Sequence, residues 1–419
     1  MPPVTLMIIG AGQRGQVYAE YARLHPEQAR IVAVAEPRNA YRARLAGAHR
    51  VPPENVVADW RDLLRPALAD ALIIATPDRL HTEPAVAFAG LGYDILLEKP
   101  MAPTAAECEQ IVQAVRASGV VFAVAHVMRY GSYTQRLKGL IASGLIGDLV
   151  CVQHLEPVGF SHQAHSFVRG NWRNEAASTF MLMSKSCHDI DWLRYIMGRR
   201  CVQVSSFGSL MHFRKEKKPP EAGEAARCVD CTYEPRCAYS AKRIYFAAMA
   251  NSTVGASVLD ILTPDHTTEG LLKALAEGPY GRCVYECDND VVDHQVVNLL
   301  YEDGATASFT MTAFTEWPLD RQTRLFGTLG ELRGDGRTIR HYDFYTFKEQ
   351  VIEVPPATTE LLVHSDADYL LMQGFVEAVA TRDQGKVLSG PDETLETHLT
   401  VFAAEQARRE GRVVAVNVH

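Results

Sequence analysis

Several features that mark whole classes of protein are missing from this sequence of 419 residues. No apolar run approaches the ~18 to 20 residues that a membrane-spanning helix needs. Positive charge is not in excess: 42 lysines and arginines face 50 aspartates and glutamates, and a net charge of −8 is the wrong sign for binding nucleic acid. Internal repeats and low-complexity tracts are also missing. We therefore expect a folded protein with neither membrane nor nucleic acid as its partner.

The first residues and the cysteine count argue against a secreted, disulfide-bonded protein. Met1 to Thr5 carry no basic segment of the kind that begins a secretory signal. Nine cysteines, an odd number, favour reduced thiols or a metal site over a disulfide framework. The expected compartment is the cytoplasm.

Residues 1–125 alternate short apolar runs with helical patterns, which predicts a doubly wound parallel sheet of the Rossmann type. The predicted strands are Leu6 to Ile9, Ile31 to Ala35, Ala71 to Ala75, Ile95 to Leu97 and Val120 to Ala125. Thr104 and Glu107 form a capping box that begins the last helix of this region, and Gly119 is placed to end it.

Residues 126–419 predict a second, α+β domain with a large, mostly antiparallel open sheet. The strands expected there are Val150 to Leu155, Val202 to Phe207, Val296 to Tyr301 and Ala305 to Thr312. Helices are expected near Cys187 to Met197, Tyr369 to Ala380 and Pro391 to Arg409, and the last two are placed to pack back on the first domain. A basic, proline-containing stretch predicts an insertion at about 212–245.

A dinucleotide fingerprint, Gly10-Ala11-Gly12-Gln13-Arg14-Gly15, follows the first strand and opens a helix. Its glycines suit a tight turn, the approach of a pyrophosphate and helix packing, and the helix N-terminus supplies N–H donors. Glu36 ends the second strand, where a carboxylate can bind the ribose hydroxyls and repel a 2′-phosphate. We therefore expect NAD as the cofactor, with NADP, aided by Arg38 and Arg42, as the lesser alternative.

Further motifs extend the pattern over nearly the whole chain. They are Ala75-Thr76-Pro77 followed by His81, Leu97-Glu98-Lys99-Pro100, His188-Asp189-Ile190-Asp191 and Gly330-Glu331-Leu332. With the fingerprint, this set resembles the glucose–fructose oxidoreductase, inositol dehydrogenase and rhizopine catabolism family, Gfo/Idh/MocA. The resemblance implies a nicotinamide cofactor, an open sheet that forms subunit contacts in a dimer or tetramer, and further cofactor-binding residues at Thr76, Pro77, His81, Glu98, Lys99 and Arg129.

Lys99 and His188 are the expected catalytic pair. Lys99 ends a parallel strand, where ligands bind, and its amine can stabilise an oxyanion as hydride leaves the substrate. His188 can accept the hydroxyl proton near neutral pH. The family usually has an aspartate four residues before this histidine, but here Ser184 occupies that position, so Asp191 or another carboxylate would have to assist. Lys185 is a second candidate cation, for catalysis or for an anionic substrate group.

The expected substrate-binding residues include this pair and its neighbours, together with residues just past the last Rossmann strand and in a later loop. They are Lys99, Arg129, Tyr130, Trp172, Arg173, Lys185, His188 and Asp191.

A cysteine cluster is the candidate metal site. Cys228-Val229-Asp230-Cys231 has the spacing of a metal knuckle, and Cys237 follows it. His212 could complete a tetrahedral, structural zinc site, with free thiols as the alternative. Cys283 and Cys287, in a strand-like segment, are expected to be unconnected thiols.

Taken together, these patterns predict an NAD-dependent oxidoreductase that transfers hydride between nicotinamide and a ring hydroxyl of a sugar, a sugar derivative or a cyclic polyol. Two alternatives remain. The first is an NAD-requiring redox glycosidase that oxidises C3 transiently, eliminates the aglycone, adds water and returns the hydride. The second is a cofactor-binding sensor without turnover, against which the presence of both Lys99 and His188 argues.

Overall fold

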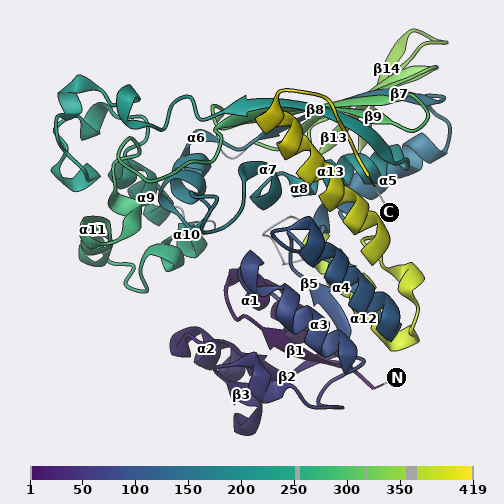
Figure 1. The fold of residues 1–419 in the computed structure, drawn as a ribbon, viewed down its shortest axis with the longest axis horizontal. Helices are drawn as coiled ribbons and strands as arrows, with labels where there is room; N and C mark the ends of the chain where they lie inside the picture. The colour runs from purple at the N-terminus through teal and green to yellow at the C-terminus, as the bar shows by residue number, and fades with distance from the viewer. Residues whose placement is uncertain (1, 251–254, 317–318, 355–365, 418–419) are drawn as a thin grey trace.

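A computed structural model describes residues 2–250, 255–316, 319–354 and 366–417, which form two lobes (Figure 1). The first lobe is built on a six-stranded, wholly parallel sheet in the order β3-β2-β1-β4-β5-β6. Its strands are β1 (Val4–Ile9), β2 (Ala29–Ala35), β3 (Val56–Val57), β4 (Ala71–Ile74), β5 (Asp94–Leu97) and β6 (Phe122–Val124). All five predicted strands are present, and the two-residue edge strand β3 was too short to be recognised from the sequence.

Helices cover both faces of this sheet, and each face has its own apolar core. They are α1 (Gln13–Leu24), α2 (Asn39–His49), α3 (Thr82–Gly90) and α4 (Ala105–Ser118). At the start of α4 the Glu107 N–H donates to the Thr104 hydroxyl oxygen at 3.2 Å, and that hydroxyl donates to the Glu107 carboxylate at 2.6 Å. Gly119 ends the helix with φ of +62°. Both ends of this helix are as predicted.

The second lobe contains a nine-stranded sheet in the order β14-β13-β12-β11-β7-β10-β9-β8-β15, antiparallel except where β7 and β10 meet. The fold class is therefore as predicted. Its strands are β7 (Leu149–Pro157), β8 (Cys201–Ser209), β9 (His294–Tyr301), β10 (Thr306–Thr312), β11 (Gln322–Gly327), β12 (Gly330–Gly334), β13 (Thr338–Asp343), β14 (Lys348–Glu353) and β15 (Val414–Ala415).

One face of the large sheet is covered by helices that bury its main core. The helices of this lobe up to β8 are α5 (Ser132–Ala142), α6 (Phe160–His162), α7 (Met181–Ser184) and α8 (Cys187–Met197). The C-terminal helices α12 (Ala367–Thr381) and α13 (Pro391–Glu410) join the lobes, because α12 packs into the core of the first sheet and α13 contacts both α4 and α8. Among the described residues, no helix has the length and apolarity to cross a membrane.

The insertion between β8 and β9 is longer than the predicted 212–245. It continues through α9 (Ala241–Ala250), α10 (Gly255–Leu262) and α11 (Thr268–Glu277), far to the left in Figure 1. These helices bury their apolar side chains against one another, around Tyr245, Leu271 and Leu275, and form a separate small core. The prediction was too short because these apolar stripes face the insertion itself and not the sheet.

Candidate functional site

Lys99 lies immediately after β5, at the carboxyl end of the parallel sheet, in a Lys99–Pro100 peptide that is cis. Its Nζ donates a hydrogen bond to the Ser184 carbonyl oxygen at 3.1 Å. Ser184 is the last residue of α7 in the second lobe. An amine of the first lobe therefore lies against the segment that leads into α8, the helix that carries His188.

The buried Glu98 carboxylate holds the end of β5 in place. It accepts hydrogen bonds from Arg14 Nε and the Tyr18 hydroxyl, both at 2.6 Å, and from the Lys99 N–H at 2.8 Å. Burial opposes ionisation of Glu98, but Arg14 and Lys99 outweigh it and lower the pKa of this carboxyl. Arg14 also pairs with Asp368 of α12. Glu98 and Arg14, expected as cofactor contacts, thus bind each other and brace the strand end.

His81, expected as a cofactor contact, binds two backbone carbonyls of the protein. It is fully buried, and its two ring nitrogens lie 2.9 Å from the carbonyl oxygens of Pro100 and Thr76. Both nitrogens are therefore occupied. His81 ties the loop after β4, which contains Thr76 and Pro77, to the loop after β5.

The turn between β1 and α1 has the shape that a dinucleotide needs. Gly10 has φ of +95°, and a Cβ there would lie 2.6 Å from the Ala75 carbonyl oxygen. A Cβ on Gly15 would lie 2.0 Å from the Gly10 carbonyl oxygen, so the helix packs closely on the strand. Gly12, the N-cap of α1, provides no side-chain cap, and no acidic residue stands in the first turn. The N–H groups at the start of α1, which include Gln13, therefore suit a pyrophosphate.

Glu36 stands at the end of β2 beside this turn. Its carboxylate accepts the Ala11 N–H at 2.9 Å and pairs with Arg38 Nε at 2.8 Å. Arg42 donates instead to the Glu36 and Pro37 carbonyl oxygens. The donor set at this end of the sheet fits the adenosine side of a nicotinamide dinucleotide.

The segment before His188 is not one continuous helix. Ser184 and His188 do not lie on one helix, because α7 ends at Ser184 and α8 begins at Cys187. The break turns the Ser184 carbonyl toward Lys99. His188 is 7% exposed, and its ring meets that of His126 edge-on with centroids 5.8 Å apart.

Lys185 belongs to a cluster of charges that the sequence did not reveal. Its Nζ lies 2.8 Å from the Glu156 carboxylate, which also pairs with Arg321 at 2.9 Å. Arg321 pairs in turn with Asp189, which His154 Nε2 approaches at 3.1 Å. Burial opposes ionisation of Asp189, but Arg321 and His154 outweigh it and lower the pKa of this carboxyl.

Of this cluster only Lys185 and Asp189 gave a sequence signal, because both lie next to His188 in the chain. Glu156 and Arg321 are separated by 165 residues and reach the site from β7 and from the segment before β11, so no periodicity links them.

Arg129 and Asp191 bind each other inside the protein, contrary to expectation. Arg129 is fully buried, and its Nε and Nη2 donate to the Asp191 carboxylate at 2.7 and 2.8 Å. Its Nη1 donates to the Leu388 carbonyl oxygen at 2.6 Å and pairs with Glu393 of α13. The charge of Asp191 is therefore matched by Arg129, whose guanidinium binds α8, Leu388 and α13.

Two other expected substrate contacts, Tyr130 and Arg173, also bind other residues of the protein. The buried Tyr130 hydroxyl lies 2.9 Å from the Ser389 hydroxyl and accepts the Leu388 N–H at 2.9 Å. Arg173 pairs with Asp288 of the insertion at 2.8 Å, and Trp172 beside it is 39% exposed. The sequence placed these residues after a strand or in a glycine-containing loop. That position does not show whether a side chain packs inside the protein or points toward a substrate.

His212 does not lie with the three cysteines as a fourth ligand, as the sequence predicted. His212 Nε2 lies 3.1 Å from the Tyr285 hydroxyl, and His212 packs among aromatic rings. In the part of the chain that the structure describes, no three His, Cys, Asp or Glu side chains are arranged to hold a metal ion.

A dinucleotide-binding lobe whose strand ends face a second α+β lobe is the architecture of a two-domain, nicotinamide-dependent oxidoreductase. Comparison with known families agrees. Residues 4–126 match the family model described as "Oxidoreductase family, NAD-binding Rossmann fold", and residues 138–416 match "Oxidoreductase family, C-terminal alpha/beta domain". The chain belongs to the Gfo/Idh/MocA oxidoreductase family.

The individual relatives described next are at most 30% identical to this chain. The chain is 30% identical over 213 residues to the 2,7-anhydro-N-acetylneuraminate hydratase of Mediterraneibacter gnavus, a match of 50% of this chain and 53% of that protein. It is 30% identical over 222 residues to the inositol 2-dehydrogenase of Klebsiella pneumoniae, which covers 52% and 61%. The matched part thus spans about half the length of these relatives. A solved levoglucosan dehydrogenase, in complex with NADH and L-sorbose, has the same fold, with TM-score 0.74 and 18% identity over 100% of both chains.

His126 should make stability depend on pH. Burial lowers the pKa of His126 to about 3, below the value near 6.5 of an exposed histidine, so the unfolded chain binds one more proton between these pH values. Stability from this group is present above pH ~6.5 and is lost as pH falls toward ~3. In His126→Phe, the free energy of unfolding measured by urea titration should fall less steeply between pH 6 and 4, by about 1.4 kcal/mol per pH unit.

Tyr130→Phe, a change at a nearby buried residue that does not titrate in this range, is the control and should keep the wild-type slope. Equal slopes for His126→Phe and wild type would contradict the prediction.

Proposed function

We propose that this protein is an NAD-dependent oxidoreductase that transfers hydride between nicotinamide and a ring hydroxyl of a sugar, a sugar derivative or a cyclic polyol. The observation that carries the proposal is the position of Lys99, whose amine leaves the nucleotide-binding sheet and reaches Ser184, close to His188. The sugar and polyol dehydrogenases among the relatives support this substrate class.

Lys99 and His188 have complementary roles in this proposal. When bound, the nicotinamide accepts or supplies the hydride. Lys99 donates a hydrogen bond to the reacting oxygen and stabilises the charge that develops there. His188 accepts the hydroxyl proton during oxidation and returns it during reduction. The Ser184 carbonyl orients the Lys99 amine, the part that the family's aspartate plays elsewhere at this position.

Lys185 is proposed to act at the edge of the site. Its side chain, paired with Glu156, is 18% exposed, and a substrate oxygen or an anionic substituent would approach it there. Such a lysine contributes to substrate binding and orientation more than to the proton transfer itself.

The preference for NAD over NADP is proposed from the end of β2. The Glu36 carboxylate is 2% exposed and ionised, since Arg38 and the Ala11 N–H outweigh burial and lower its pKa. A fixed negative charge at this point repels a 2′-phosphate, and its pairing with Arg38 removes a cation that would otherwise attract that phosphate.

The Lys99→Met variant should lower kcat by about 10³-fold, because it removes the charged hydrogen-bond donor without removing the packing of the stem. NAD binding, followed by the quenching of protein fluorescence, should stay within about twofold of the wild type because Lys99 is not part of the glycine turn. Full activity in Lys99→Met would contradict a chemical role for this residue.

The redox glycosidase remains the second candidate function, supported by Ser184 in place of the usual aspartate and weakly by the hydratases among the relatives. In that reaction the hydride returns to the sugar after the aglycone has been eliminated and water has added.

Incubating the protein and NAD with a panel of free sugars, cyclic polyols and chromogenic glycosides should distinguish the two reactions. A dehydrogenase should accumulate NADH, measured by its absorbance, with a free sugar or polyol. Aglycone release that requires NAD but leaves no net NADH would show the glycosidase. Neither signal with any member of the panel would count against both.

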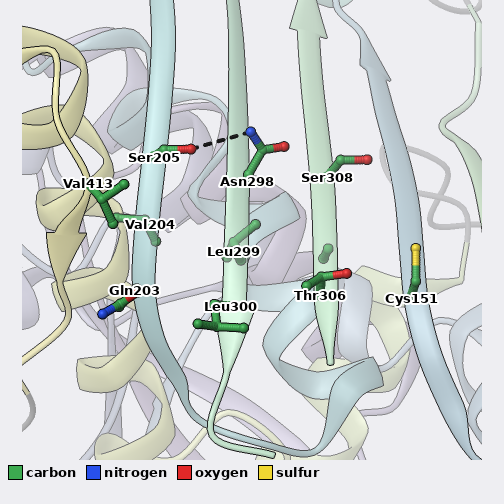
Figure 2. Close-up of a pocket in the computed structure, with 11 residues that line it drawn as sticks. Cys151, Gln203, Val204, Ser205, Asn298, Leu299, Leu300, Thr306, Ser308 and Val413 are labelled. Carbon is green, nitrogen blue, oxygen red and sulfur yellow. Dashed lines mark hydrogen bonds between the residues drawn. The ribbon is translucent and has the colours of Figure 1, made fainter. Parts of the chain in front are cut away.

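We also propose that the open face of the nine-stranded sheet is a contact between copies of this chain. Figure 2 shows this face, where Ser205, Asn298 and Ser308 project from neighbouring strands over a hollow of about 410 Å³. Farther along the same face Phe207 and Val296 are cross-strand neighbours, 63% and 37% exposed. Exposed apolar side chains on an uncovered sheet face are typical of a subunit interface.

The Phe207→Glu variant should shift the protein toward the monomer in sedimentation velocity, because it places a charge in the proposed contact. Phe347→Glu, at a 77% exposed position in the loop between β13 and β14, is the control and should not change the sedimentation coefficient. A wild-type protein that sediments as a monomer at all concentrations would overturn the proposal.

A further inference from the structure

Four cysteines line one small cavity in the insertion, away from the catalytic cleft. The cavity has a volume of about 20 Å³, which is room for a single water-sized sphere and nothing larger. Its cysteines are Cys228, Cys231, Cys237 and Cys283. Three of them belong to the metal knuckle found in the sequence, and the fourth, Cys283, takes the place that the sequence assigned to His212.

Cys283 reaches the knuckle through the backbone. The residues around it are not the expected strand but a turn, in which Cys287 Sγ lies 3.2 Å from the Cys283 carbonyl oxygen. Arg227 and Arg282 form an isolated antiparallel bridge, and the Cys283 N–H donates to the Ala226 carbonyl oxygen at 2.8 Å. This pairing sets Cys283 beside the segment that begins at Cys228.

A buried cation without a carboxylate partner faces the same cavity. Arg169 is fully buried and lines it. Its Nε and Nη2 donate to the carbonyl oxygens of Arg282 and Tyr239 at 2.7 and 2.8 Å, and its Nη1 has no hydrogen-bond partner. Among the described residues no carboxylate pairs with Arg169, and Glu234 at the cavity is already bound to Lys242 at 3.2 Å. A guanidinium stays protonated, so its burial calls for a negative charge nearby.

The sulfur of Cys228 lies beside this guanidinium. It accepts hydrogen bonds from the Ala241 N–H at 3.4 Å and from Arg169 Nη2 at 3.6 Å, and it lies 3.9 Å from the Arg282 carbonyl oxygen. When a cation replaces the thiol proton, the two N–H donors remain in place to bind the metal-bound sulfur. Arg227, which also lines the cavity, donates only to the carbonyl oxygens of Leu275 and Gly278 and adds a second positive charge.

We propose that Cys228, Cys231, Cys237 and Cys283 bind one zinc-class divalent cation as a closed tetrathiolate. Binding forms four metal–sulfur bonds and releases the thiol protons to solvent, so no oxidant or reductant is needed. Four thiolates and one divalent cation leave two negative charges, which face the guanidinium groups of Arg169 and Arg227 at the cavity. With all four positions filled by protein, the ion is structural and takes no part in the hydride transfer.

The sulfurs are not gathered around one point in the described structure. Four protonated thiols attract one another only weakly, so nothing draws them together until a cation replaces their protons. All four residues already line one cavity, and we expect a change of the cysteine χ1 rotamers to turn the sulfurs into it on metal binding. Metal binding should therefore tighten the insertion and the segment from Gln163 to Arg169 that packs against it.

The full-length protein should contain about one zinc per chain when produced with zinc in the medium, as measured by plasma mass spectrometry after gel filtration. X-ray absorption of that protein should show four sulfur ligands at about 2.3 Å and no nitrogen ligand. Protein without zinc, even after anaerobic titration with Zn²⁺, would overturn the proposal. A shell of three sulfurs and one nitrogen would overturn the assignment of Cys283.

Variants provide an independent test. Cys283→Ser should weaken zinc binding at least about tenfold in competition with a chromogenic chelator. Cys287→Ser, a neighbouring thiol outside the cavity, and His212→Asn are the matched controls and should bind zinc like the wild type. Zinc binding that survives Cys283→Ser, or that is lost equally in Cys287→Ser, would contradict the site. If Cys283→Ser does not fold, as judged by circular dichroism, the absorption spectrum of the wild type decides the ligand set.

Discussion

The buried carboxylate of Glu98 is the constraint on which the position of the proposed chemistry depends. It is held on one side by Arg14 and Tyr18 and on the other binds the Lys99 N–H, so the backbone at the end of β5 has little freedom. β5 itself is wholly buried within the parallel sheet. The backbone that leads into Glu98 is therefore also held in place. The Lys99 side chain therefore extends from a fixed backbone position, and its amine reaches Ser184 of the second lobe.

Similar buried charge pairs tie distant segments of the chain together. Arg14 reaches Asp368 on α12, and Arg129 reaches Asp191 on α8. Buried ion pairs gain little net stability, because the cost of desolvation offsets most of their attraction. Their directional geometry is the more important effect, since a small displacement of either segment would leave a charge buried without its partner. These pairs therefore fix the position of α12 against α1, and of α8 against the segment that follows β6.

The candidate site shows what a sequence motif can and cannot locate. The glycine turn, Lys99 and His188 could be proposed from the sequence because each belongs to a short motif next to a recognisable strand or helix. His81, Arg129 and Tyr130 had the same kind of motif support, yet their polar atoms bind backbone carbonyls or buried partners. A motif gives the position of a residue along a strand or loop, but not whether its side chain turns toward the cleft or into the protein.

The amino-acid sequence by itself determined the main helices and strands of the two lobes. Strand alternation, helical periodicity, capping and the glycine turn are all set by residues only a few positions apart. It thereby also determined the fold class and the cofactor-binding turn. Tertiary structure alone decided the partners of the charges and thiols: Arg321 with Asp189, Arg129 with Asp191, and Cys283 beside the cysteine knuckle. These choices depend on which segments, distant in the chain, lie side by side, and on the need of every buried charge for a neighbour of opposite sign.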